Sequence, residues 1–199
     1  MLSCNKAIKR EVLYMRHNEV VNALWSTVLA VGGQAVREPV GLEFDDGRRP
    51  DLQLVFPGQH VLTDAVVVHP MAPGYVNNGT SLSATGAACA LQRTKRQKYM
   101  KTAARHEAML LPFAVETCEG MAPDAVRLLR LIARAGHEQL GMLPVEHIAR
   151  QLVGAVVMAV QRGTVMVYLS RYIRAVARPA AGGTGGKQDG RLEEHEGRE

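Results

Sequence analysis

The chain has 199 residues, of which 47% are hydrophobic and 22% charged, and its formal net charge is +5 at pH 7. These proportions are typical of a soluble globular protein with room for one domain and a tail. The three cysteines are odd in number and widely separated, which argues against a zinc site and a disulfide framework. The N-terminus lacks the apolar core of a secretory signal, and the longest apolar run, LVGAVVMAV, is about half a membrane span. We therefore expect a nuclear or cytoplasmic protein without membrane contact.

The first half of the chain predicts one helix and three strands. Apolar residues recur at three- and four-residue steps from about residue 8 to residue 31, where two glycines end the pattern. Runs rich in apolar residues, bounded by turn residues, then predict strands at 35–44, 51–56 and 60–69. Residues 70–83 are rich in Pro, Gly and Asn, and we expect a loop there.

The second half is mainly helical. A basic segment at 88–108 lacks Gly and Pro and predicts a helix, and the apolar run 108–117 predicts a strand buried on both faces. A helix should follow at 124–135, and residues 136–144 should connect it to a last helical region from 145 to about 177, interrupted at Gly163. The Gly-rich polar remainder predicts a disordered tail.

This order of elements predicts an α/β fold in which a small mixed sheet has helices on both faces. The expected organisation is a start of the first helix, a core, a helical extension and a tail, at residues 1–14, 15–136, 137–178 and 179–199.

Two carboxylates lie in the otherwise apolar stretch 47–70, at Asp51 and Asp64. A hairpin closed symmetrically about Pro57-Gly58 would place them directly opposite each other, with Cβ atoms about 5 Å apart, whereas a three-residue loop would put them out of register. Their repulsion could be offset by a shared proton, a basic neighbour, or a divalent cation such as Mg²⁺ or Mn²⁺. The alternative is a pair of exposed strand-end acids neutralised by Arg48 or Arg49.

Several motifs occur here in a recognisable order. Arg49-Pro50-Asp51 is followed by twelve residues and Asp64, then by a Lys-x-x-Lys-Tyr helix at 95–99 and the strand PFAVET with a Gly just after it. This order, over roughly residues 15–175, resembles the restriction-like endonuclease domains of early-branching, site-specific non-LTR retrotransposon proteins, which have the PD-(D/E)xK nuclease fold. The resemblance implies a restriction-endonuclease-like core with extra C-terminal helices, and a metal-dependent DNA endonuclease that nicks a target strand.

The resemblance also implies roles for individual residues. Asp51 and Asp64 would hold Mg²⁺ or Mn²⁺, and a lysine would orient the attacking water or stabilise the phosphate. The usual lysine position, two residues after the second acid, is Val66 in this chain. The lysine would then come from the following helix, with Lys98 as the first choice and Lys95 as the second.

Four other residues near these motifs have more ordinary explanations. Glu19 could add a third metal ligand, although single helix acids are mostly surface residues. His17 and Tyr99 are expected to have structural roles. Glu116 could either join the site or cap the next helix.

The predicted basic helix carries six positive charges within thirteen residues. Such a concentration suits a phosphate backbone, with salt-sensitive and sequence-independent binding, although a solvated helix face has the same pattern. Arg48 and Arg49 could contact phosphates beside the acid pair. The expected nucleic-acid-binding residues are Arg48, Arg49, Arg93, Arg96, Lys101 and Arg105.

Three functions therefore stay open. The first is a metal-dependent endonuclease, which would have DNA as its partner and a reverse transcriptase or element RNA in trans as the further partners that the resemblance implies. The second is a nuclease fold that has lost cleavage and remains a DNA-binding or interaction module. The third is an α/β protein with no nucleic-acid role. The oligomeric state is left open.

Overall fold

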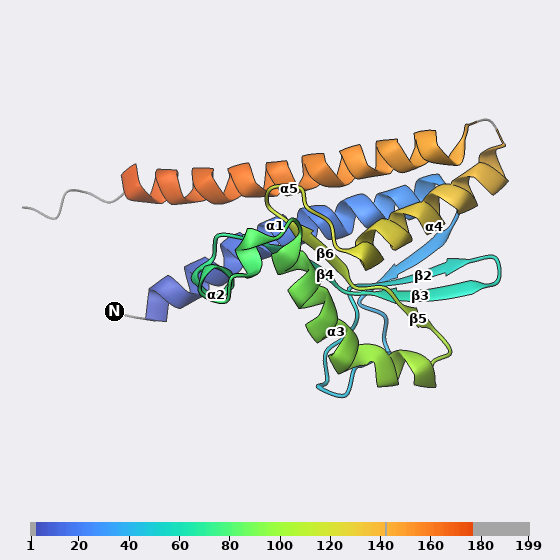
Figure 1. The fold of residues 1–199 in the computed structure, drawn as a ribbon, viewed down its shortest axis with the longest axis horizontal. Coiled ribbons are helices and arrows are strands. Elements are labelled where there is room, and N and C mark those ends of the chain that lie inside the picture. Colours follow the sequence, from blue (N-terminus) through green and yellow to red (C-terminus); the bar gives the residue numbers. More distant parts are fainter. Residues whose placement is uncertain (1–2, 142, 177–199) are drawn as a thin grey trace, which may run out of the picture.

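Two long helices lie side by side and cover one side of a small β-layer (Figure 1). The structure is a computed structural model that describes residues 3–141 and 143–176. The long helices are α1 (Ser3–Ala30) and α5 (Val145–Val176), and α4 (Pro123–Leu140) packs beside them. On the other side of the strands lies α3 (Gly86–Arg105), as Figure 1 shows.

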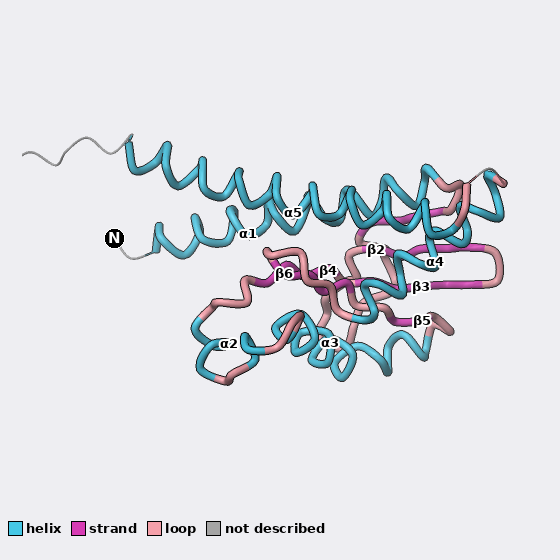
Figure 2. The backbone as a smooth tube through the Cα atoms, turned by 45° about the horizontal axis from the view of Figure 1, so that its top comes forward, coloured by secondary structure: helices cyan, strands magenta, loops and turns pink. Residues whose placement is uncertain are grey.

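The strands form two sheets, drawn in magenta in Figure 2. A four-stranded mixed sheet has the order β1-β2-β3-β5, and a two-stranded parallel sheet pairs β4 with β6. The strands are β1 (Gln34–Arg37), β2 (Leu52–Phe56), β3 (Gln59–Thr63), β4 (Ala65–Val68), β5 (Met109–Leu110) and β6 (Phe113–Glu116). Helices on both sides of a small mixed sheet confirm the α/β prediction at this level.

The β2–β3 hairpin has the predicted register. Its pairs run from Phe56 opposite Gln59 to Leu52 opposite Thr63, so its loop is the two-residue turn Pro57-Gly58. Gly58 has a φ of +70°, which glycine adopts at little cost. Asp51 and Asp64 follow directly after the last pair, at the open end of the hairpin.

Two predicted strands are each divided in the structure. The stretch predicted as one strand at 60–69 is β3 followed by β4, and the run at 108–117 is β5 followed by β6. Pro112, which has no N–H, lies at the second division, while Leu111 donates to the Leu62 carbonyl and Phe113 to the Asp64 carbonyl, both at 3.0 Å. The two segments therefore stay hydrogen-bonded to each other where they pass from one sheet to the other, and Asp64 lies at that point.

Each face of the β2–β3 hairpin has its own apolar core. Leu54 and Val61 pack with the side chains of α1, α4 and α5. Leu62, one residue further along β3, packs on the opposite face with Tyr99 and Ala103 of α3. The alternation of successive side chains between faces therefore joins the two helical layers through one hairpin.

Several expected boundaries were wrong, including the start of the first helix, which begins at Ser3 rather than at about residue 8. The first strand ends at Arg37, because Glu38 has a φ of +42° and Pro39 follows. The loop 70–83 contains a short helix, α2 (Pro73–Asn77), and a 3-10 turn (Thr80–Leu82). The helix expected at 124–135 continues to Leu140, and α5 is not interrupted at Gly163. The end of the last predicted helix and the predicted tail lie outside the described residues.

Two glycines inside helices, Gly136 of α4 and Gly163 of α5, lie where α1 approaches closely. A Cβ at Gly136 would lie 2.8 Å from Cγ1 of Val31, and a Cβ at Gly163 would lie 2.5 Å from the Cα of Arg16. Neither position has space for a larger residue at this spacing. These glycines are therefore contact points between helices rather than helix ends.

The helix α5 contains a stretch, Val145–Ile173, that is long and apolar enough to cross a membrane by length and composition alone. The nine-residue run noted in the sequence understates this length. Apolar residues of the same helix, Val156, Ala159 and Val160 among them, are buried in the core with α1 and α4. Since a core helix of a soluble protein passes the same test, the stretch is weak evidence for a membrane span.

Candidate active site at the acid pair

Four elements meet at the open end of the β2–β3 hairpin. Asp51 precedes β2, Asp64 separates β3 from β4, His17 comes from α1, and Lys95 comes from α3. His17 contacts Asp51, and Lys95 contacts Asp64. Each acid is therefore held by a basic side chain from a different helix.

Hydrogen bonds fix the Asp51 carboxylate in one orientation. Its Oδ2 accepts the backbone N–H of Ala65 at 2.6 Å, and its Oδ1 lies 3.3 Å from Nε2 of His17. The Asp51 carbonyl also accepts the N–H of Glu38 at 3.1 Å. The bond to Ala65 ties the start of β2 to the start of β4, across the point where the chain changes sheets.

Asp64 is buried, with only 8% of its surface exposed, and the ammonium of Lys95 donates to its Oδ2. Burial, and after it the negative charge of Asp51, raise the pKa of Asp64 to about 6, against the opposing effect of Lys95. A carboxyl with such a pKa gains and loses its proton near neutral pH. It is also a group whose ionised form a divalent cation would favour.

His17 is held close to both acids. Burial lowers the pKa of His17, but the hydrogen bond to Asp51 and the charges of Asp51 and Asp64 more than offset that effect, so the pKa lies above its usual value. We expected a structural role for this histidine. The contact joins residues far apart in the sequence, so no local pattern around His17 indicates it.

The two candidate lysines diverge around the ring of Tyr99. Lys95 reaches the acid pair, whereas Nζ of Lys98 lies 2.5 Å from Oδ2 of Asp46. The two ammonium nitrogens lie 5.4 and 5.2 Å from the centre of the Tyr99 ring, which is buried and stacked on Phe44. The structure thus brings the second choice, Lys95, to the acids, and the packing of Tyr99 separates it from the first choice.

Glu19 is not brought to the acid pair. Its carboxylate pairs with Arg162 of α5 at 3.3 Å. Two residues along a helix correspond to about 200° of rotation, so Glu19 and His17 leave α1 in different directions. The α1 residue that contacts the acid pair is therefore His17.

An open cavity of about 730 Å³ lies against the acid pair. Arg48 and Arg49 line it, and each also pairs with a nearby acid, Asp46 or Glu43, at 3.3 Å. Val66, the residue two positions after Asp64, lines the same space. The lining residues are Tyr14, His17, Arg48, Arg49, Asp51, Asp64, Ala65, Val66, Val67, Lys95 and Tyr99.

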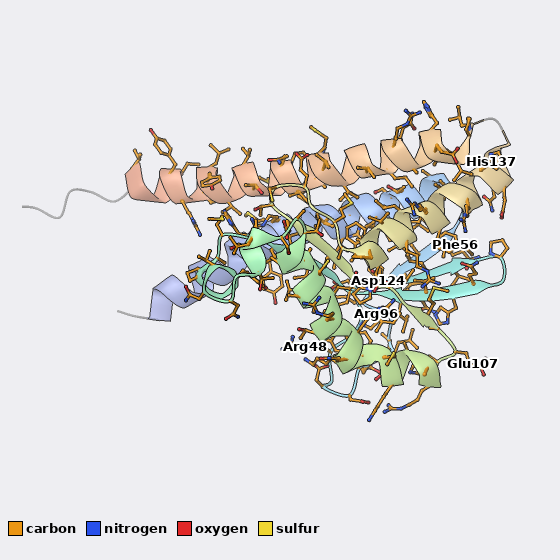
Figure 3. The ribbon with its side chains drawn as sticks, viewed as in Figure 1. Arg48, Phe56, Arg96, Glu107, Asp124 and His137 are labelled. Carbon is orange, nitrogen blue, oxygen red and sulfur yellow. The ribbon has the colours of Figure 1, made fainter. Side chains whose placement is uncertain are left out.

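The predicted nucleic-acid-binding residues of α3 differ in their partners. Arg96 makes two hydrogen bonds, at 2.6 and 2.7 Å, to the buried carboxylate of Asp124 at the start of α4, and Figure 3 shows both residues between these helices. Arg105 pairs with Asp45 at 2.8 Å. Arg93 and Lys101 are exposed and have no ion pair within 3–141 and 143–176. Arg96 is thus tied into the fold, while exposed pairs such as Arg105–Asp45 exchange partners at little cost.

Glu116 does neither of the two things that the sequence suggested, because it caps α3, an earlier helix, rather than joining the site or capping the next helix. Its Oε1 accepts the N–H groups of Ala87 and Ala88, at 3.0 and 3.2 Å, in the first turn of α3. Cys118 donates to its other oxygen at 3.4 Å. Glu116 therefore caps the helix that carries Lys95 and contacts neither acid.

The donor set at this site is small. Among the residues that the structure describes, no group of three or more His, Cys, Asp or Glu side chains is arranged to hold a metal ion. Asp51 and Asp64 nevertheless offer two carboxylates, and Mg²⁺ is usually bound by one or two carboxylates, with water and substrate phosphates as the other ligands. The acid pair fits a cation of that kind. No model of a known protein family matches the chain, and no curated protein matches it either.

Proposed function

We propose that the protein is a metal-dependent endonuclease that hydrolyses phosphodiester bonds in DNA. The observation that carries the proposal is the acid pair itself, in which Asp51 and a buried Asp64 of raised pKa lie beside Lys95 in an open cavity. Two carboxylates can hold a metal ion that promotes phosphodiester hydrolysis, and a lysine can stabilise charge on the phosphate. The arginines that line the cavity add charge suited to a phosphate backbone.

The chain's own residues would prepare the site. The N–H of Ala65 and the ring of His17 hold the Asp51 carboxylate in place, so the ligand set needs little reorganisation. Lys95 can donate to a phosphate oxygen or to the attacking water when its contact with Asp64 is exchanged. When bound at the two carboxylates, Mg²⁺ or Mn²⁺ would polarise the scissile phosphate and stabilise charge on its oxygens.

The resemblance to retrotransposon-type restriction-like domains supports the same conclusion. In those domains the lysine is expected from the helix after the second acid. In this chain the usual lysine position, two residues after that acid, is the uncharged Val66. Lys95 comes from that helix and contacts Asp64, which agrees with the expectation. The PD-(D/E)xK fold assignment is part of this proposal.

A second function, DNA binding without cleavage, is favoured by one observation. Lys95 already neutralises Asp64, so the acid pair is compensated without a cation. In that case Mg²⁺ would not raise the melting temperature of the protein. In the endonuclease case Mg²⁺ raises it for the wild type and not for Asp64→Asn.

Plasmid nicking by the purified protein tests the proposal, with Mg²⁺ or Mn²⁺ compared with EDTA. We expect metal-dependent nicking that falls about a hundredfold or more in Asp64→Asn and Lys95→Ala. The matched controls are Glu19→Gln and Lys98→Ala, an acid and a lysine whose partners lie elsewhere. Wild-type nicking by Asp64→Asn would overturn the assignment, and equal losses in the two lysine variants would remove Lys95 from its role.

A further inference from the structure

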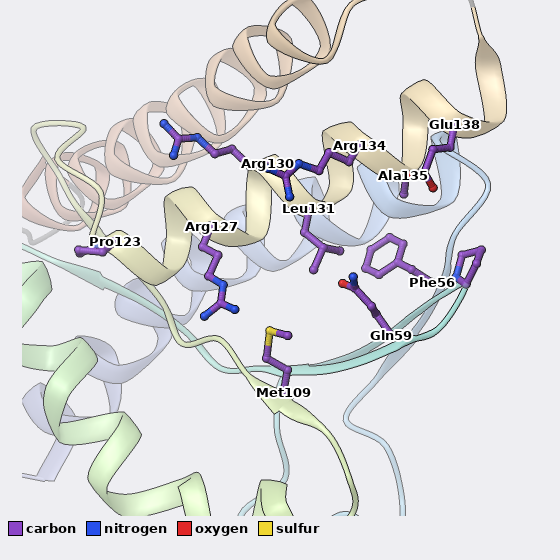
Figure 4. Close-up of a pocket in the computed structure, with 11 residues that line it drawn as sticks. Phe56, Gln59, Met109, Pro123, Arg127, Arg130, Leu131, Arg134, Ala135 and Glu138 are labelled. Atoms are coloured by element: carbon purple, nitrogen blue, oxygen red, sulfur yellow. The ribbon is translucent and has the colours of Figure 1, made fainter.

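A second hollow lies at the closed end of the β2–β3 hairpin, beneath α4 (Figure 4). Its volume is about 590 Å³, and it shares no lining residue with the acid-pair cavity. Along β2 it is five residues from Asp51, or roughly 17 Å. The residues that line it are Phe56, Pro57, Gln59, Met109, Pro123, Arg127, Arg130, Leu131, Arg134, Ala135 and Glu138.

Three arginines from α4 form one side of this hollow. Arg127, Arg130 and Arg134 are all exposed, and their spacing of three and four residues places them on one helix face. Among the described residues none of them has an ion pair, in contrast to Arg96 and Arg105 of α3. Glu138 is the one acid in the lining, so the hollow has an excess of positive charge.

The floor of the hollow is apolar. Leu131 and Phe56 meet there, with Met109 opposite α4, and Figure 4 shows Arg127 reaching down from the helix toward Met109. The side-chain amide of Gln59 lies beside Phe56 in the same view. The hollow thus combines guanidinium groups at its rim, an apolar floor, and the Gln59 amide, which can both donate and accept a hydrogen bond.

We propose that this hollow binds one unpaired base of a single-stranded nucleic acid, with neighbouring phosphates of the same strand on the α4 arginines. Guanidinium groups bind phosphate oxygens in pairs, and an apolar floor suits the face of a base. The base of a duplex is not available to a concave floor, and the Asp and Glu side chains of an acidic peptide carry no flat apolar surface. The inference does not rest on hydrolysis, because the two sites share no residue.

The length of the arginine face agrees with this ligand. From Arg127 to Arg134 the helix rises about 10 Å. Neighbouring phosphates of an unpaired strand lie farther apart than the axial rise of about 3.4 Å per nucleotide in a duplex, so two phosphates, rather than three, span that distance. Two neighbouring phosphates can therefore lie near the outer arginines, Arg127 and Arg134.

Fluorescence anisotropy with labelled oligothymidylate tests the proposal on the full chain, in EDTA so that cleavage does not contribute. The variant is Arg127→Gln with Arg134→Gln, and its matched control is Arg150→Gln with Arg171→Gln, two exposed arginines of α5. For the α4 variant we expect affinity to fall roughly tenfold or more at low salt, and the slope of log affinity against log salt to fall by about 1.4. The control should change both by much less.

Three further binding measurements identify which chemical group the hollow recognises. An abasic oligonucleotide of equal length should bind less tightly than oligothymidylate, and so should a duplex. Equal affinity for the abasic strand would overturn base binding, and equally effective competition by polyglutamate would assign the hollow to acidic chains instead. If both double variants bind like the wild type while nicking persists, the hollow is not a nucleic-acid site, although the proposed function stands.

Discussion

Asp64 is the residue whose ionisation should affect stability most clearly. Its pKa is raised from a usual value of 3.8 to about 6, so the folded state binds a proton more tightly than the unfolded state does. The stability that this proton provides is fully present below about pH 4 and is lost as the pH rises through 6. The raised pKa of His17 acts in the same direction at higher pH.

The prediction concerns the protein without metal. Between pH 4 and 7 the free energy of unfolding of the wild type should fall by about 3 kcal/mol relative to Asp64→Asn, which has no proton to lose there. Urea denaturation at a series of pH values measures the difference. Asp46→Asn is the control, since the pKa of that exposed carboxyl is lowered mainly by its hydrogen bond to Lys98. Parallel pH profiles for wild type and Asp64→Asn would contradict the prediction.

At the residue scale, the sequence predicted the acids better than their partners. The turn at Pro57-Gly58 fixes the hairpin register, and the register places Asp51 and Asp64 together. The choice between Lys95 and Lys98 depends instead on how α3 is rotated about its axis. That rotation is set by the burial of Tyr99 and by contacts from distant strands, which no local pattern in the sequence carries.

At the element scale, Glu116 holds the start of α3. The N–H groups of Ala87 and Ala88 belong to buried residues, and within the helix the first N–H groups have no partner. Glu116→Ala should leave both without an acceptor and lower the free energy of unfolding by about 1–3 kcal/mol. Because Lys95 lies on the same helix, loss of this cap should also loosen its contact with Asp64.

Chemical denaturation of three variants checks this prediction. Glu116→Gln keeps an amide oxygen as acceptor and should lose less stability than Glu116→Ala. Glu119→Ala removes an exposed side chain whose partner is Gln161, and it should stay within about 0.5 kcal/mol of the wild type. If Glu116→Ala is as stable as Glu119→Ala, the cap contributes nothing.

The divided strands show what the sequence pattern misses at this scale. The apolar runs at 60–69 and 108–117 are continuous, and apolarity alone predicts one strand in each. Pro112 is the residue in the sequence that indicates a division, because proline has no N–H to donate to a neighbouring strand. The matching division at Asp64 follows from pairing with that segment, which is a contact between distant parts of the chain.

At the scale of the whole molecule, the helical layer depends on close approach between α1 and its neighbours. Glycine lowers the stability of a helix interior by about 1 kcal/mol relative to alanine, so Gly136 and Gly163 appear in the sequence as places where helices end. The structure has helix at both positions, with α1 against them. The sequence reveals that these glycines are unfavourable for a helix but not that a second helix requires them.

Two glycines of α5 offer a test of this packing in which the same substitution should have opposite effects. A Cβ at Gly154 would meet nothing within 4 Å, so Gly154→Ala should stabilise the protein by about 0.5–1 kcal/mol through helix propensity alone. A Cβ at Gly163 would lie 2.5 Å from the Cα of Arg16, and backbone cannot move aside as a flexible side chain does. Gly163→Ala should therefore separate α1 from α5 and destabilise the protein by about 1–3 kcal/mol despite the same gain in propensity. Urea midpoints of the two variants measure both effects.

Since His17 follows Arg16 in α1, Gly163→Ala should also weaken the contact of His17 with Asp51. If both alanines stabilise the protein equally, the helices do not approach at Gly163, and the position of His17 beside the acid pair would need another support.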